Sequence, residues 1–118
     1  MYFTIGGQIA WNPSMGIGRL YVKYLAAVEE ILQVPVGAWP VPGDPDDIRI
    51  DPESFGRFTA NAQRAYGSSN SPVFREQLGV VLFPAIVMLQ RAGFGDLVSE
   101  DDPEQRERAA AFSAGMTL

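Results

Sequence analysis

The sequence predicts a mainly α protein, namely a small helical bundle of three main helices plus a short C-terminal helix, with an N-terminal β-hairpin. Two β-prone runs flank a Gly-Gly pair near the start of the chain, and apolar residues then recur at helical spacing in long segments. A chain of 118 residues suffices for one hydrophobic core. We therefore expect residues 1–118 to form a single domain.

The β-hairpin is expected over residues 2–11. Its two runs, Y-F-T-I and Q-I-A-W, are separated by Gly6 and Gly7, a dipeptide that suits a two-residue turn with positive φ. An isolated two-stranded hairpin is only marginally stable in water. This hairpin is therefore expected to lie against the helices.

The first long helix is expected over residues 13–33. Pro13 suits the first turn of a helix, and either Asn12 or Ser14 can cap it. Pro35 ends the helix, because the residue before a proline resists the α conformation. Its buried face is expected to consist of apolar residues at three- and four-residue spacing, namely Ile17, Tyr21, Tyr24, Val28 and Ile31.

The other helices are expected over residues 52–66, 72–92 and 103–113. Each begins with a capping Asp or Ser followed by a proline, which is compatible with the first helical turn. The sequence G-S-S-N-S at 67–71 is expected to separate the first two of these helices. The final residues, 113–118, are expected to fray.

The helix expected at 72–92 is apolar on almost every side in its second half, so it should run through the middle of the bundle. Pro84 departs from this pattern, because a proline inside a helix removes one hydrogen bond and clashes with the carbonyl of Val80, at a cost of about 3 kcal/mol. Two interpretations follow. Pro84 is either a tolerated kink that curves the helix around the core, or a kink that opens a cavity where a freed carbonyl faces a ligand.

Composition excludes several classes of function. The formal net charge is −5, and Lys23 is the only lysine beside eight arginines, so no basic stripe is present and we expect no nucleic-acid partner. The chain has neither Cys nor His, which excludes Cys–His and Ser–His nucleophile pairs and metal sites built on imidazole or thiolate. We expect no metal and no cofactor. Catalysis would have to use Asp, Glu, Tyr, Ser, Arg or Lys23, or a borrowed cofactor.

The same composition bears on localisation. The first residues, M-Y-F-T-I-G-G, lack the basic and apolar regions of a signal peptide. The most apolar stretch, residues 78–89, is too short to span a bilayer, and a buried core helix explains it better. We therefore expect a cytoplasmic protein without a membrane partner.

The segment V-P-V-G-A-W-P-V-P-G-D-P-D-D at residues 34–47 is rich in proline and aspartate. Its D-x-D-D spacing is superficially that of cyclases that protonate alkenes, but water in a loop would keep these acids ionised. A calcium loop is excluded, because Ile48 and Arg49 occupy positions that need a ligand and a glycine. We expect a stiff, docked connection in which Trp39 turns inward, either to fill the core or to cover a ligand.

Polar groups near the expected helix ends are candidate site residues, and Trp39 and Tyr24 complete the available lining of a pocket. The candidates for ligand binding are Trp11, Asn12, Tyr24, Trp39, Asn61 and Asn70. If the protein is an enzyme, Asp51 could act as a base, while Arg75 beside Tyr66 could bind a carboxylate or an enolate.

Four short motifs together resemble those of a family of short, uncharacterised bacterial proteins. They are W-N-P-S at 11–14, I-D-P-E-S-F at 50–55, S-S-N-S-P at 68–72 and Q-R-A-G at 90–93. The resemblance covers roughly residues 2–93, and residues beyond 94 would form an extension outside it. It implies a self-standing domain and implies nothing about mechanism.

Three functional hypotheses follow. The first is a small cytosolic module that binds an apolar small molecule or a protein without catalytic chemistry of its own, and that could form a homodimer through an apolar helix face. The second is a cofactor-independent cyclase or isomerase, as in natural-product biosynthesis, acting on an apolar metabolite in a helical pocket. The third is an acidic immunity-type inhibitor, whose acids at 44–51 and 96–104 would have to form one face.

Overall fold

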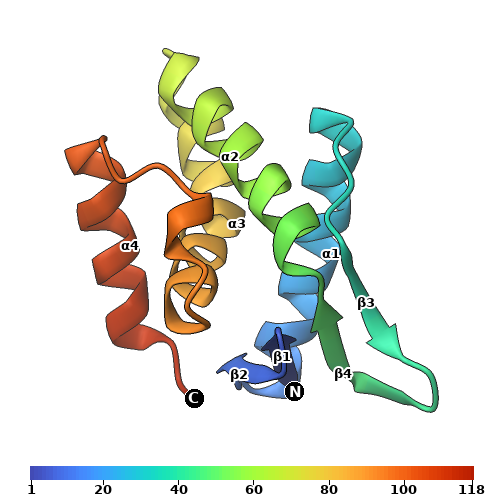
Figure 1. The fold of residues 1–118 in the computed structure, drawn as a ribbon. Coiled ribbons are helices and arrows are strands. Elements are labelled where there is room, and N and C mark those ends of the chain that lie inside the picture. The colour runs from blue at the N-terminus through green and yellow to red at the C-terminus, as the bar shows by residue number, and fades with distance from the viewer.

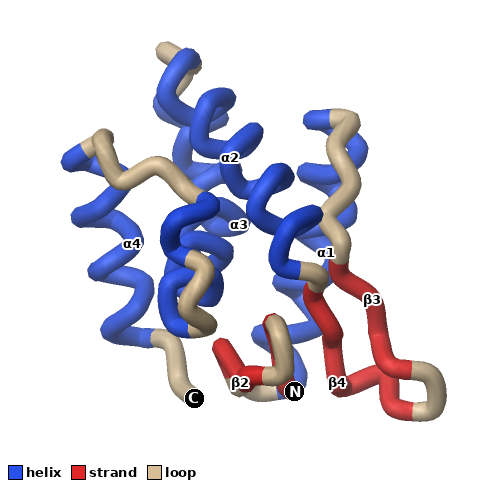
Figure 2. Tube along the Cα trace, in the orientation of Figure 1, coloured by secondary structure: helices blue, strands red, loops and turns tan.

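A computed structural model describes residues 1–118. Four helices and a small sheet pack around one core (Figures 1 and 2). In chain order the elements are β1 (Tyr2–Ile5), β2 (Gln8–Trp11), α1 (Met15–Leu32), β3 (Ala38–Val41), β4 (Asp44–Ile50), α2 (Pro52–Ser68), α3 (Pro72–Arg91), the 3-10 helix η1 (Gly95–Leu97) and α4 (Pro103–Gly115). The four expected helices and the hairpin of β1 and β2 are confirmed, and no end is shifted by more than two residues.

The capping residues explain where three of the helices begin. The side chain of Asp51 accepts a hydrogen bond from the backbone N–H of Ser54 at 2.9 Å, and Asp102 caps α4 through the N–H of Glu104 at 2.9 Å. Ser71 caps α3 in the same way. A proline follows each cap, as expected for a first helical turn.

The sheet is larger than the sequence predicted. It has four strands in the order β2-β1-β4-β3, in which β1 pairs with β4 in parallel and the other pairs are antiparallel. The protein is therefore an α/β structure and not a purely helical bundle with one hairpin. Sequence reasoning treated residues 34–47 as a loop because proline and aspartate are depleted in strands. The missed signal was Pro42-Gly43, a turn pair in which Gly43 has a φ of +82°.

The expectation that Trp39 turns inward was wrong. Trp39 lies on β3 at the edge of the sheet, and 49% of it is exposed. Its partner in the register is Arg49, which is also exposed, whereas the neighbouring positions on β4, Ile48 and Ile50, are buried. Side chains alternate between the two faces of a strand, so the pairing of β3 with β4 sends the Trp39 ring outward.

Helix α3 is the core of the molecule and packs against α1, α2, α4 and β2. It is buried continuously from Val81 to Leu89, as its sequence predicted. It is also the one helix long and apolar enough to cross a membrane, but 61% of that apolar window is buried inside the fold. The burial is compatible with a soluble protein whose central helix is apolar.

The C-terminal residues do not fray, contrary to expectation. Met116 is buried, and the guanidinium of Arg91 donates hydrogen bonds to the carbonyls of Met116 at 2.8 Å and Ala10 at 3.1 Å. Thr117 and Asn12 also exchange two hydrogen bonds, one between backbones and one from the Thr117 hydroxyl. These contacts fix the end of the chain against β2, a long-range pairing that local sequence does not reveal.

Candidate ligand-binding groove

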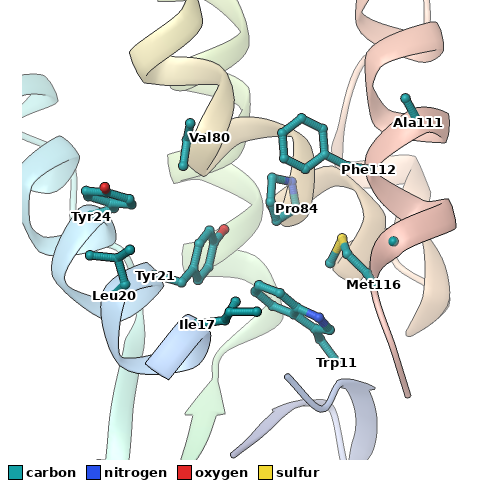
Figure 3. Close-up of a pocket in the computed structure, with 11 residues that line it drawn as sticks. Trp11, Ile17, Leu20, Tyr21, Tyr24, Val80, Pro84, Ala111, Phe112 and Met116 are labelled. Carbon is teal, nitrogen blue, oxygen red and sulfur yellow. The ribbon is translucent and has the colours of Figure 1, made fainter. Parts of the chain in front are cut away.

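An apolar groove of about 480 Å³ lies between three helices. Figure 3 shows α3 as its floor, α1 and α4 as its two walls, and Trp11 of β2 across one end. Nine of its eleven lining residues are hydrophobic. The lining residues are Trp11, Ile17, Leu20, Tyr21, Tyr24, Val80, Pro84, Ala111, Phe112, Gly115 and Met116.

Aromatic packing holds the Trp11 end of the groove in place. Trp11 is the last residue of β2, and its ring stacks on Phe3 of β1 with centroids 5.3 Å apart. It also meets the ring of Tyr21 edge-on at 5.2 Å. Aromatic pairs in these geometries are favourable beyond the area they bury. The groove therefore has one preformed, rigid end.

Pro84 lies on the floor of the groove, within an otherwise continuous helix. A proline leaves the carbonyl four residues earlier, that of Val80, without its helical donor. The hydroxyl of Tyr21 donates a 2.8 Å hydrogen bond to the adjacent carbonyl, that of Val81. This bond joins α1 to α3 where the proline disturbs the backbone. Pro84 is thus both a tolerated core residue and part of a cavity surface.

The chemistry of the lining favours apolar contacts. No carboxylate, lysine or arginine is among the lining residues. Burial raises the pKa of Tyr21 far above its usual value, so its hydroxyl stays neutral and remains bonded to Val81. The Tyr24 hydroxyl and the Trp11 indole N–H are the side-chain polar groups that remain for a ligand. Such a site can bind and orient an apolar molecule.

A second apolar cavity of about 360 Å³ continues from the groove between α1 and α3. It shares Tyr24 and Val80 with the groove, so the two form one continuous apolar surface. Phe74 and Leu78 of α3 and Ile31 of α1 line its far part. The long axis of this surface follows α1.

The residues proposed for catalysis do not form one site. Tyr66 and Arg75 do lie together, since the Arg75 guanidinium is 4.5 Å from the centre of the Tyr66 ring. Both bind Glu104, which accepts from the Tyr66 hydroxyl at 3.0 Å and pairs with Arg75 at 3.0 Å. Asp51, however, caps the opposite end of α2, roughly 22 Å from Tyr66 along the helix axis.

The Tyr66–Arg75–Glu104 cluster joins α2, α3 and α4. Burial and the Glu104 carboxylate raise the pKa of Tyr66, which keeps its hydroxyl protonated as a donor. The charges of Arg75 and Glu104 compensate each other, so an incoming carboxylate would compete with Glu104. These contacts explain the cluster as a connection that holds α2, α3 and α4 together.

The structure brings two of the six proposed ligand-binding residues, Trp11 and Tyr24, into the groove. Asn12 is engaged with Thr117, and Asn61 donates to the carbonyl of Arg57 one turn earlier in α2. Two others lie away from the groove. Trp39 borders a small cavity on the sheet side, and Asn70 lies in the connection between α2 and α3, next to the Tyr66–Arg75–Glu104 cluster.

Sequence reasoning missed most of the groove. The buried face expected for α1 was partly wrong, because Ile17, Tyr24 and Ile31 are exposed and the buried residues are Gly18, Tyr21 and Leu25. The breadth of the apolar stripe on α1 was the available signal, since one buried face does not require it all. Phe112 and Met116 gave no such signal, because only the packing of α4 against α3 places them beside Pro84.

No group of acidic residues is arranged to hold a metal ion. In the D-x-D-D segment, Asp46 forms an ion pair with Arg19 at 3.3 Å, and Asp44 accepts a hydrogen bond from the backbone of Asp46. The segment is therefore part of the surface of β4, away from the groove.

No curated protein and no solved structure matches this chain. One family does match, and its description is a family of unknown function (DUF6086). The match covers residues 1–118, so residues 94–118 belong to the family pattern and are not an extension outside it. The protein is a member of this family of unknown function over its full 118 residues.

Proposed function

We propose that the protein is a small cytosolic binding module that holds an apolar small molecule in the groove between α1, α3 and α4, without catalytic chemistry of its own. The observation that carries this proposal is the groove itself. Its volume of about 480 Å³ falls within the roughly 300–1,000 Å³ typical of ligand sites. Its lining is almost wholly apolar, which is also typical.

The shape of the groove supports a ligand of limited size with one polar end. Trp11 and Tyr21 form a packed aromatic end, so an apolar group would meet a preformed surface there. Tyr24 lies farther along α1 and is partly exposed, so its hydroxyl could bond a polar group at the open side. Burial of apolar ligand surface would supply most of the binding free energy.

The other two hypotheses have less support. A cyclase or isomerase needs polar groups that converge on its substrate, and the polar cluster of Tyr66, Arg75 and Glu104 lies outside the groove. An immunity-type inhibitor needs one acidic face. Figure 1 shows β4 and the segment that leads into α4 on opposite sides of the molecule, so their acids do not form one surface.

Ligand binding can be tested with the neutral dye Nile red, which fluoresces strongly in apolar sites. The expected result is saturable binding that excess dodecanol reverses. Trp39→Phe leaves Trp11 as the only tryptophan, and its emission should change as the dye binds, because Trp11 lines the groove. An unchanged Trp11 emission during saturable binding would contradict this site.

Two neighbouring substitutions on α4 provide the matched comparison. Ala111 lines the groove, whereas Ala110 is exposed and faces away from it. Ala111→Trp should fill the groove and weaken dye binding by about tenfold or more, equivalent to about 1.4 kcal/mol. Ala110→Trp should leave binding unchanged. Equal binding by both variants would show that the dye occupies another site.

A further inference from the structure

Helix α1 carries a second apolar stripe that lies outside the buried core, along the open side of the two cavities. Its residues recur at alternating three- and four-residue spacing, which is the pattern of a coiled-coil seam. We call this set the α1 seam, and it consists of Ile17, Leu20, Tyr24, Ala27 and Ile31. All five are exposed, including Ile17 at 57%, Leu20 at 50% and Ile31 at 70%.

The core does not need the α1 seam. The residues of α1 that are buried are Gly18, Tyr21 and Leu25, which lie on another side of the helix. Isolated exposed apolar residues are common on proteins, but a continuous row along a whole helix marks an interaction surface. The row continues into the apolar cavity between α1 and α3, so a partner helix would find a groove beside it.

Two unpaired charges flank the α1 seam. Lys23 and Glu30 each directly precede a seam residue, both are exposed, and neither takes part in an ion pair. They are seven residues apart on the same side of α1, about 10.5 Å along its axis, which is too far for a contact within one chain. The flank of the seam is therefore positive towards the start of α1 and negative towards its end.

We propose that the α1 seams of two copies of this chain pair in antiparallel orientation, about a two-fold axis that passes between Tyr24 and Ala27. In this register the large Tyr24 of one copy packs on the small Ala27 of the other, and Leu20 of one packs on Ile31 of the other. Each contact occurs twice, as a two-fold interface requires. The four contacts make a continuous apolar layer between the two helices.

The charges select the antiparallel orientation. It brings Lys23 of each copy close to Glu30 of the other, which forms two symmetric ion pairs. It also places the positive end of each helix dipole beside the negative end of the other. A parallel pair would hold the two Lys23 side chains at the same level, and likewise the two Glu30 side chains. A second copy therefore offers a charge pattern complementary to that of the seam, with Glu30 opposite Lys23 on both sides of the axis.

The proposed dimer uses residues that also line the two cavities, but it can be tested separately from ligand binding. Ile17, Leu20 and Tyr24 belong to both the seam and the wall of the groove, and Ala27 and Ile31 line the second cavity, so the second copy would cover the open α1 side of both. Lys23 and Glu30 line neither cavity. Charge substitutions at these two positions therefore change self-association without changing the groove.

The test is a charge-reversal cycle followed by sedimentation equilibrium and light scattering over a range of protein concentrations. The wild type should show a reversible monomer–dimer equilibrium. Lys23→Glu and Glu30→Lys should each weaken it by roughly tenfold or more, because two ion pairs become two repulsive contacts. The double variant carrying both substitutions should restore wild-type association, because the pairs re-form with exchanged signs.

Control variants make the result specific. Arg64→Glu on α2 changes the net charge as much as Lys23→Glu does, but Arg64 is exposed on another helix and should leave the dimer unchanged. Ile31→Asp should abolish association while circular dichroism shows an intact fold, because Ile31 is outside the core. A wild type that remains monomeric at millimolar concentration would overturn the proposal, and so would a double variant that fails to associate.

Discussion

Helices α1 and α2 have similar lengths, 18 and 17 residues, and yet they use their side chains differently. Helix α2 buries seven residues, including Phe55 and Phe58, whose rings stack 6.2 Å apart. Helix α1 buries only three, although more of its residues are large and apolar. The apolar residues of α2 are therefore accounted for by the core, whereas most of those on α1 face the groove or solvent.

This difference suggests that the side chains of α2 mainly stabilise the fold, whereas the exposed apolar side chains of α1 serve binding. A fully buried ring contributes to folding through transfer from water and close packing. A half-exposed leucine on α1 contributes little to the isolated fold, so its place in the sequence is better explained by a ligand or a partner. Substitutions of similar size on the two helices should therefore have very different effects.

The largest effect is expected for Phe58→Ala on α2. Phe58 is fully buried, so truncation should lower the free energy of unfolding by about 3–5 kcal/mol, from lost burial and the cavity left behind. Urea denaturation followed by circular dichroism measures this change. A loss below about 1 kcal/mol would remove the proposed contrast between α2 and α1.

A smaller effect is expected for Tyr21→Phe, because the Tyr21 hydroxyl joins α1 to the core helix α3. The substitution removes the hydrogen bond from the Tyr21 hydroxyl to the Val81 carbonyl, which should cost about 0.5–1.5 kcal/mol. The pH dependence should also change. Burial raises the Tyr21 pKa above its value of 10.0 in the unfolded chain, so the wild type loses stability as the pH rises above about 10.

Tyr21→Phe removes this titrating group, so the variant should lose less stability than the wild type between neutral and alkaline pH. Thermal unfolding at pH 7 and above pH 10 provides the comparison. Equal alkaline losses in the two proteins would mean that Tyr21 does not sense the change in pH.

Leu20→Ala on the α1 seam should have little effect on the folded monomer. Leu20 is half exposed, so the expected loss is about 1 kcal/mol or less when urea denaturation is measured at a concentration too low for dimers. The same variant should weaken both Nile red binding and self-association. A destabilisation as large as that of Phe58→Ala would show that the seam belongs to the core.

The smallest effect is expected for Glu76→Gln on the outer side of α3. Arg108 of α4 binds Glu76 at 3.0 Å and lowers the pKa of the carboxyl. A lowered pKa adds stability above the unfolded value of 4.5, and this contribution disappears as the pH falls below it. The wild type and the variant should therefore differ slightly in melting temperature at pH 7 and converge near pH 3. A difference that persists at pH 3 would contradict this cause.

Local signals predicted the helices well and the sheet poorly. Asp51-Pro52, Ser71-Pro72 and Asp102-Pro103 marked helix starts because capping is a contact between near neighbours. Strand β4 had no comparable signal, since D-P-D-D-I-R-I combines residues that disfavour strands with only two apolar positions. Its pairing with β1 joins segments more than 40 residues apart, so no local rule could identify it.

The candidate site was predicted in the same uneven way. Trp11, Tyr24 and Trp39 are the aromatic candidates, and Trp11 and Tyr24 line the groove. Trp39 lies exposed on the edge strand instead, because the register of β3 decides which face its ring occupies. Residue type suggested which side chains could bind a ligand, but it could not show which of them lie together in one site.

The sequence by itself determined the helices, their caps, the central position of α3 and the absence of imidazole and thiolate chemistry. These properties depend on composition and on contacts a few residues apart. Only the tertiary structure decided the four-stranded sheet, the outward position of Trp39, the anchoring of the C-terminal residues by Arg91 and the meeting of α1, α3 and α4 around Pro84. Those features join distant parts of the chain, and their geometry is set by how whole elements pack.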